Sequence, residues 1–162
     1  MEKRLEFLTV ETDVGGFSVL LENGQLAGCG FDVRGDFPAH ARLSPVAEKL
    51  RQSLVRYFRE GKWDFDRVKL PVSRVSPIAR KVYDYLRVRV GPGTTISYRD
   101  LGMACGTGPR AVASLMAHNP WAVIVPCHRV IGSDGSLGGY AGGVRIKEWL
   151  LCKEGVKVRP GR

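Results

Sequence analysis

The pair Asn23-Gly24, between two stretches of strand character, is the sequence feature that most constrains the fold. Asn-Gly favours a two-residue hairpin turn, because both residues tolerate the positive φ angles that such a turn requires. Strand character extends over residues 17–22 before the pair, over 26–31 after it, and over 5–10 further upstream. The sequence therefore predicts a small antiparallel sheet in the first third of the chain.

Two Ser-Pro pairs mark the starts of predicted helices. Serine caps free N–H groups, and proline suits the first turn because its missing N–H would have no partner there. Ser44-Pro45 predicts a helix that ends at Gly61, and Ser76-Pro77 predicts one that ends at Gly91. The expected apolar faces are Val46, Leu50, Leu54, Tyr57 and Phe58 in the first helix, and Ile78, Val82, Tyr85 and Leu86 in the second. Residues 62–75, with Pro71, are predicted to form a linker.

A helix-turn-helix is predicted over residues 97–118. Ser97 and Asp100 form a capping-box-like start, and a second short helix begins at Pro109 after a glycine turn. Its expected buried side is Val112, Leu115 and Met116, and small side chains on the other side would allow close approach to a DNA groove. An ordinary helical hairpin with packed alanines is the alternative.

Together these elements predict an α+β fold with two parts. Residues 1–75 are expected to form a structural domain made of the antiparallel sheet and one helix. Residues 76–162 are expected to form a mostly helical C-terminal domain that contains the helix-turn-helix. No internal repeat or low-complexity tract interrupts this organisation.

The composition, 44% apolar and 25% charged, is that of a soluble globular protein. No apolar stretch approaches the ~20 residues of a membrane span, and no signal-peptide core follows the first residues, so we expect a cytoplasmic protein without a membrane partner. Four cysteines (Cys29, Cys105, Cys127 and Cys152) lack C-x-x-C spacing, which argues against a zinc knot and a disulfide framework. No metal site is expected; a zinc site from Cys29 and His40 is the less favoured alternative to a packed Cys29.

The net charge of +9 is unevenly distributed. Residues 1–75 hold 12 basic and 11 acidic side chains, whereas residues 76–162 hold 13 basic and 5 acidic ones. A basic half of this kind favours a polyanionic partner, with nucleic acid first and an acidic membrane surface second. A solvated basic face without any partner is the alternative.

The segment Pro126-Cys127-His128-Arg129-Val130 carries the main candidate chemistry. Residues 121–125 before it predict a short buried strand that Pro126 ends, because proline lacks the N–H that a ladder needs. A thiol reacts as its thiolate, which requires a nearby base or cation. Neighbours on an extended chain point to opposite faces, so contact between Cys127 and His128 needs a turn or a water bridge. By itself the segment leaves open whether Cys127 is catalytic or simply buried.

Several separated motifs together resemble the O6-alkylguanine-DNA alkyltransferases. These motifs are Asn119-Pro120, Pro126 to Val130, Gly142-Gly143 and Lys147-Glu148-Trp149-Leu150, in family order and spacing over residues 76–155. The N-terminal half fits the family only in outline. The resemblance implies a DNA-repair protein that acts on alkylated guanine in double-stranded DNA, with O4-alkylthymine as a second candidate. The alkyl group would move irreversibly to the protein's own cysteine, in one turnover and without a cofactor.

The resemblance also implies the roles of the catalytic residues. Cys127 would accept the alkyl group, His128 would remove the thiol proton through a water, and Glu148 would orient His128. Asn119 would tie the recognition helix to the active-site strand. Tyr98 would rotate the target nucleotide outward and could donate a proton to the leaving guanine. Arg129 is expected to make a structural ion pair or a phosphate contact.

Further residues are expected to contact DNA or to line the pocket. Arg110 would fill the place that the flipped base vacates, and the other expected DNA contacts are Ala111, Ser114 and Tyr98. The expected pocket residues are Tyr140, Ala141, Val130 and Ala122. Ala141 stands where many relatives have serine, and Ala122 where they often have proline. No zinc set in the N-terminal half matches the metal site that some relatives carry.

Two other functions fit parts of the sequence. A lesion-sensing relative would flip alkylguanine without reacting, but such relatives lack the active cysteine, which is present here as Cys127. A thiol hydrolase could use Cys127 and His128, although the basic helix-turn-helix disfavours it.

We expect the protein to act as a monomer.

Overall fold

The expected antiparallel sheet is present in the computed structural model, which describes residues 2–31, 33 and 42–158. Its strands are β1 (Leu5–Thr12), β2 (Gly15–Glu22) and β3 (Gln25–Phe31), in the order β1-β2-β3. Glu22 pairs with Gln25, and the φ angles of Asn23 and Gly24 are 51° and 78°. The hairpin prediction is therefore confirmed. His40, the other residue of the alternative zinc site, is outside the described residues.

Helix α1 (Pro45–Glu60) packs against β1 and begins and ends where the sequence predicts. The Ser44 hydroxyl accepts a hydrogen bond from the Ala47 backbone N–H, and Gly61 ends the helix with a φ of 71°. One predicted core position is wrong, because Val46 is 56% exposed and Ala47 is buried in its place. The buried stripe runs from Ala47 through Leu50, a spacing that leaves position 46 facing solvent.

The segment predicted to be a linker is packed into the protein. It contains the short 3-10 helix η1 (Val72–Arg74), and the Phe65 side chain is fully buried. The indole N–H of Trp63 donates to the carbonyl oxygen of Val123 at 2.8 Å. Because polar residues surround these two aromatic residues in the sequence, the composition of the segment did not indicate that it is packed into the core.

The next elements form the predicted helix-turn-helix and the helix before it. Helix α2 (Pro77–Arg89) is capped by Ser76; it buries Ala79 and Tyr83, whereas Ile78 is exposed and Tyr85 only half-buried, contrary to prediction. Strand β4 (Ile96–Ser97) leads into α3 (Tyr98–Cys105), and α4 (Pro109–Ala117) follows. A Cβ at Gly102 would lie 2.6 Å from the Thr107 carbonyl oxygen, so only glycine allows this tight turn.

Residues 121–125 are buried as expected, apart from the half-buried Ala122, but they do not form the predicted strand. The Val125 N–H donates to the Trp121 carbonyl at 2.8 Å, and Val123 has a φ of 73°. Left-handed φ is strained for a β-branched residue, so tertiary contacts, including that of Trp63, hold this turn. Cys127 therefore begins a 3-10 helix, η2 (Cys127–Arg129), which leads into β5 (Val130–Ile131) beside β4.

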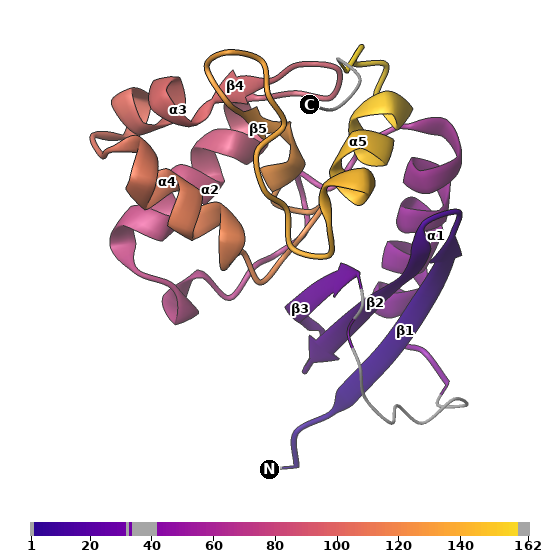
Figure 1. The fold of residues 1–162 in the computed structure, drawn as a ribbon. Helices are drawn as coiled ribbons and strands as arrows, with labels where there is room; N and C mark the ends of the chain where they lie inside the picture. Colours follow the sequence, from indigo (N-terminus) through magenta and orange to yellow (C-terminus); the bar gives the residue numbers. More distant parts are fainter. Residues whose placement is uncertain (1, 32, 34–41, 159–162) are drawn as a thin grey trace.

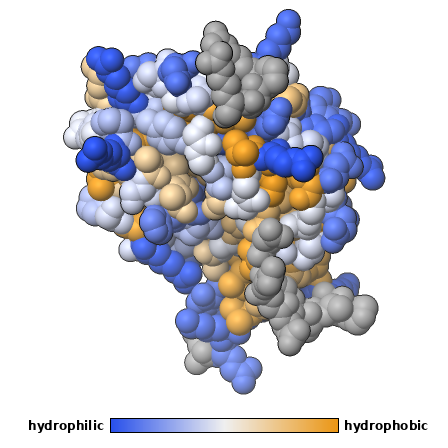
Figure 2. All heavy atoms as spheres, in the orientation of Figure 1, coloured by the Kyte–Doolittle hydropathy of each residue, from blue (hydrophilic) through white to orange (hydrophobic). Residues whose placement is uncertain are grey.

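Helix α5 (Val144–Lys153) packs against both α1 and η2, so it connects the N-terminal part of the fold to the segment that carries Cys127 (Figure 1). A Cβ atom at Gly61, at the end of α1, would collide with the Lys153 carbonyl oxygen. On the face drawn in Figure 2, hydrophilic residues line the outline and hydrophobic residues show mainly toward the middle. Among the described helices, none has the length and apolar character needed to cross a membrane.

Candidate active site

A pocket of about 390 Å³ opens between α4 and the loop before α5, and Cys127 lies in its wall. Its other lining residues are Tyr98, Ala113, Met116, Ala117, Gly139, Tyr140 and Ala141. The structure thus brings together Cys127, Tyr98, Tyr140 and Ala141, as the sequence predicts. Most of the other lining side chains are small, so the pocket has room for a planar ring beside the sulfur.

Two residues predicted to line this pocket lie outside it. Val130 is fully buried in β5 beside Ile96. Ala122 is absent from the pocket lining, and its carbonyl oxygen accepts a hydrogen bond from the Cys29 thiol at 3.3 Å. Ala122 was expected in the pocket from the family resemblance, and the turn at Val123 redirects the chain next to it.

The Cys127 thiol is buried but has groups around it that favour the thiolate. Burial raises its pKa, whereas Asn119, Lys147 and Tyr140 act to lower it. Asn119 also connects α4 to residues 121–129, which we call the reactive loop, as predicted. Its Nδ2 donates to the Val125 carbonyl at 3.0 Å, and its Oδ1 accepts from the Trp121 N–H at 3.0 Å. The sulfur is therefore fixed in place by the loop that carries it.

His128 is oriented by Glu154 and not by Glu148, which corrects the sequence-based assignment. The His128 Nε2 atom lies 2.6 Å from Glu154 Oε2, and both side chains are fully buried. Glu148 is half-buried on α5, away from this contact. Glu154 is the C-cap of α5, where the helix end meets η2. The sequence held one signal for the role of Glu154. The C-terminal end of a helix favours cations, so an acidic residue at that position indicates a specific interaction elsewhere.

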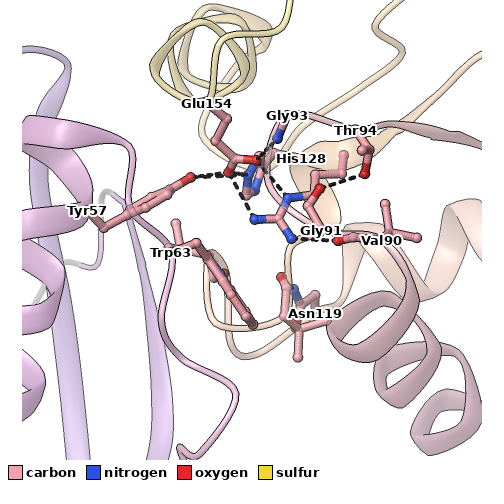
Figure 3. Close-up of polar contacts among 12 residues, drawn as sticks. Tyr57, Trp63, Val90, Gly91, Gly93, Thr94, Asn119, His128 and Glu154 are labelled. Atoms are coloured by element: carbon pink, nitrogen blue, oxygen red, sulfur yellow. Dashed lines mark hydrogen bonds and ion pairs between the residues drawn. The ribbon is translucent and has the colours of Figure 1, made fainter.

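Besides His128, the Glu154 carboxylate accepts hydrogen bonds from Arg129, Tyr57 and the Gly93 backbone N–H (Figure 3). Arg129 Nε donates to Oε1 at 2.7 Å, and its guanidinium lies 5.1 Å from the centre of the Trp63 ring. Burial raises the pKa of Glu154, but its hydrogen bonds and ion pairs with His128 and Arg129 outweigh burial and lower that pKa to about 2. Arg129 is fully buried, so of the two expected roles the structural ion pair is confirmed.

The two nitrogens of the His128 ring have different environments. Nε2 faces Glu154, whereas Nδ1 is buried and has no hydrogen-bond partner among the described residues. A carboxylate can only accept, so Nε2 carries the proton and Nδ1 holds a free lone pair. Burial lowers the pKa of His128, although Glu154 acts in the opposite direction. Nδ1 is thus available as a base at neutral pH.

Lys147 is a site residue whose importance the sequence analysis missed. It is only 1% exposed, and its Nζ donates to the carbonyl oxygens of Val130 and Leu137 at 2.6 and 2.5 Å. The same ammonium donates to the Tyr98 hydroxyl at 3.3 Å. Burial lowers the Lys147 pKa to about 8, and Cys127 opposes this shift. Lys147 fixes the loop that forms the pocket wall and places a positive charge beside the sulfur and the phenol.

Three of the four residues predicted to contact DNA lie together on an exposed face, whereas Tyr98 is half-buried on α3 in the pocket wall. Arg110, Ala111 and Ser114 all belong to α4 and are exposed to solvent. Arg110 lies in the first turn and has no ion pair within the described part of the chain. No group of three or more potential metal ligands occurs in residues 2–31, 33 and 42–158.

Comparisons with known proteins match this arrangement of fold and site. Residues 77–156 match the family model "6-O-methylguanine DNA methyltransferase, DNA binding domain". The crystal structure of the Mycobacterium tuberculosis O6-methylguanine methyltransferase superposes with a TM-score of 0.76 at 30% identity, and the match covers 93% of each chain. The chain belongs to the O6-methylguanine-DNA methyltransferase family.

Two further relatives of this family differ in what their names imply. The methylated-DNA–protein-cysteine methyltransferase of Thermococcus kodakarensis is 45% identical over 89 residues, which are 55% of this chain and 51% of the relative. The chain therefore spans about half the length of that curated relative. A "DNA base-flipping protein" of Thermus thermophilus is 40% identical over 111 residues, which are 68% of this chain and 74% of the relative.

Proposed function

We propose that the protein repairs alkylated DNA by moving the alkyl group from guanine O6 to Cys127, once per molecule. The observation that carries this proposal is the position of the Cys127 thiol in the wall of a pocket. The next residue, His128, has its Nε2 atom in contact with the Glu154 carboxylate, which leaves Nδ1 free. Family membership points to the same chemistry. The damaged base supplies the alkyl group, so the reaction needs no cofactor.

The first step is removal of the thiol proton. The turn of η2 places His128 beside Cys127 in the chain, and Nδ1 has the free lone pair that a base requires. A water between Sγ and Nδ1 carries the proton to His128, and Glu154 stabilises the imidazolium that forms. Nearby Lys147 offsets the negative charge of the thiolate.

In the second step the thiolate attacks the alkyl carbon. The S–C bond forms as the C–O6 bond breaks, and the electron pair of that bond stays on the guanine. Guanine leaves more readily if it is protonated, and the Tyr98 hydroxyl in the pocket wall is the donor. The Lys147 ammonium, 3.3 Å from that hydroxyl, stabilises the resulting phenolate. The thioether on Cys127 is stable, so each molecule reacts once.

Double-stranded DNA carrying O6-alkylguanine is the proposed partner, with O4-alkylthymine as a second substrate. The exposed face of α4 lies in a groove, and Arg110 takes the place of the extruded base, since flipping a base costs a few kcal/mol of stacking. Residues 76–162 act as the DNA-binding and alkyl-transfer domain of a monomer, and residues 1–75 form the structural domain.

Mass spectrometry of the protein after incubation with a duplex that contains O6-methylguanine tests this proposal. We expect one added methyl group on the Cys127 peptide and none in Cys127→Ala. The matched control is Cys152→Ala, which removes the exposed cysteine and should react like the wild type. Cys127 that stays unmodified in folded, DNA-binding protein would contradict the proposal.

Lesion binding without reaction is the second candidate function, favoured by the 40% identity to the Thermus thermophilus base-flipping protein. In that case the protein would bind the O6-methylguanine duplex more tightly than undamaged DNA and leave the lesion intact. Cys127 in the pocket wall is the feature that argues for transfer instead.

A further inference from the structure

Tyr57 contributes a hydroxyl group to the active site from outside the region that matches the family model. It lies on α1, whereas that match covers residues 77–156. The side chain is fully buried, and its hydroxyl points at the contact between His128 and Glu154 (Figure 3). The sequence predicts Tyr57 only as part of the apolar face of its helix, and its hydroxyl has no task in the proposed mechanism.

The hydrogen bonds around Tyr57 fix which atom carries each proton. The Tyr57 hydroxyl lies 2.5 Å from Glu154 Oε2 and 3.2 Å from His128 Nε2. A carboxylate only accepts, so Tyr57 donates to Glu154, while its oxygen serves as a second, weaker acceptor for the Nε2 proton. Burial and the neighbouring Glu154 charge raise the pKa of Tyr57 well above its usual value, so the phenol keeps its proton.

The position of this hydroxyl is strictly determined by packing. The Tyr57 ring meets Phe65 edge-on, with the ring centres 5.8 Å apart. The close approach at Gly61 fixes the end of α1 against the end of α5, next to Glu154. The aromatic residues and the glycine therefore hold the phenol in one place relative to the carboxylate.

We propose that Tyr57 is a positioning residue through which the N-terminal part of the protein sets the orientation and basicity of His128. The inference rests on the proposed function, in which His128 accepts the Cys127 proton. Glu154 Oε2 receives hydrogen bonds from Tyr57 and His128 and a longer one from Arg129 Nη2 at 3.2 Å. The bond from Tyr57 draws negative charge away from the side of the carboxylate that faces the imidazole.

The relative strength of the two Tyr57 contacts determines whether loss of its hydroxyl raises or lowers the pKa of His128. The 2.5 Å bond to Glu154 is shorter than the 3.2 Å contact with Nε2, so loss of the hydroxyl mainly increases the charge felt by His128. The imidazolium becomes more stable and its pKa rises. The other charged or titratable groups near His128 or Tyr57 are Arg129 on η2, Lys147 on α5 and Tyr140 in the loop before α5.

The variant Tyr57→Phe tests this role because it removes the hydroxyl and keeps the ring. We expect single-turnover transfer to slow by roughly ten-fold below neutral pH, as for loss of one hydrogen bond to a charged group, and the loss to shrink as pH rises. Binding of the duplex should be unchanged. The control Phe65→Leu loosens the packing around Tyr57 without removing a polar group, so it should lower the rate, if at all, equally at every pH.

A double-mutant cycle separates positioning from packing. In a Glu154→Gln background, Tyr57→Phe should have little further effect on the rate, because the charge that it modulates is gone. Equal losses in both backgrounds, or a loss independent of pH, would overturn the inference.

NMR titration of the His128 ring gives a result that does not need alkyl transfer. In Tyr57→Phe the His128 pKa should rise by about one unit, the shift that corresponds to a ten-fold loss of rate below neutral pH. An unchanged His128 pKa overturns the role of Tyr57 even if the wild type is an active transferase. Conversely, a raised pKa in a protein that leaves Cys127 unmodified supports the role of Tyr57 and rejects the proposed function alone.

Discussion

The exposed face of α4 and the buried cluster around Glu154 use charge in opposite ways. On α4, Arg110 is exposed and has no ion pair within the described residues. Around Glu154, every charged or polar side chain is buried and has a partner on a different element of the fold. Charge on the first surface is left free for an outside partner. Charge in the cluster is already neutralised and serves to hold other groups in place.

This contrast has an energetic consequence. An exposed charge costs little to keep, and its attraction to phosphate is screened by salt. A buried charge is expensive to desolvate, so removal of one partner leaves the other uncompensated. Substitutions in the cluster should therefore change stability and chemistry, whereas substitutions on α4 should change DNA binding alone.

The largest effect is expected for Arg129→Ala. It leaves the Glu154 carboxylate buried without its main counter-charge and opens space beside Trp63. We expect a loss of about 3–5 kcal/mol in the free energy of unfolding, measured by urea denaturation. Arg110→Ala is the matched control and should change this free energy by less than about 0.5 kcal/mol. If both variants changed the free energy of unfolding by similar small amounts, the contrast between the buried cluster and the exposed face of α4 would be wrong.

Acid should destabilise the wild type through Glu154. Its pKa is about 2 in the folded protein and 4.5 in a model peptide, so the ionised carboxylate stabilises the fold above pH 4.5, and this contribution disappears as pH falls toward 2. The difference corresponds to about 3 kcal/mol. The His128 pKa is also lowered by burial, so the unfolded chain binds that proton first and stability already begins to fall below about pH 6.5.

Denaturation curves of the wild type and Glu154→Gln between pH 2 and 7 measure this contribution. The variant should be less stable at neutral pH, and the gap between the two proteins should narrow as pH falls. A constant gap would show that Glu154 does not keep a lowered pKa.

Glu154→Gln and Glu148→Gln test the corrected assignment directly. Loss of the carboxylate beside His128 should slow single-turnover transfer by roughly 10²-fold or more, as expected when a general base loses the group that orients it. Glu148 lies away from His128, so Glu148→Gln should react at the wild-type rate. The opposite order of rates would restore the assignment made from sequence.

The smallest effect is expected for Arg110→Ala, measured on DNA. Affinity for the O6-methylguanine duplex should fall by about 1–2 kcal/mol, and the reaction with a free alkylated guanine base should be unchanged. If Arg110→Ala lowered both the affinity for the duplex and the rate of reaction with the free base, Arg110 would instead support the pocket itself.

Local signals in the sequence determined much of the fold and part of the site. Asn23-Gly24 requires φ angles that few other pairs tolerate, and serine caps set the starts of α1, α2 and α3. The turn and the caps depend on contacts within a few residues, which a single sequence displays directly. The residues around Cys127 gave only a candidate nucleophile and base, and the roles that the family resemblance implies for them stay predictions.

Only the tertiary structure decided which distant groups meet the reactive loop. It selected Glu154 over Glu148, brought Tyr57 and Trp63 onto the loop, and buried Lys147 under the pocket wall. The left-handed turn at Val123 was hidden because an apolar run looks the same in a buried strand and in a buried turn. Partners far apart in sequence are set by how α1 and α5 pack, and neither helical periodicity nor spacing along the chain encodes that contact.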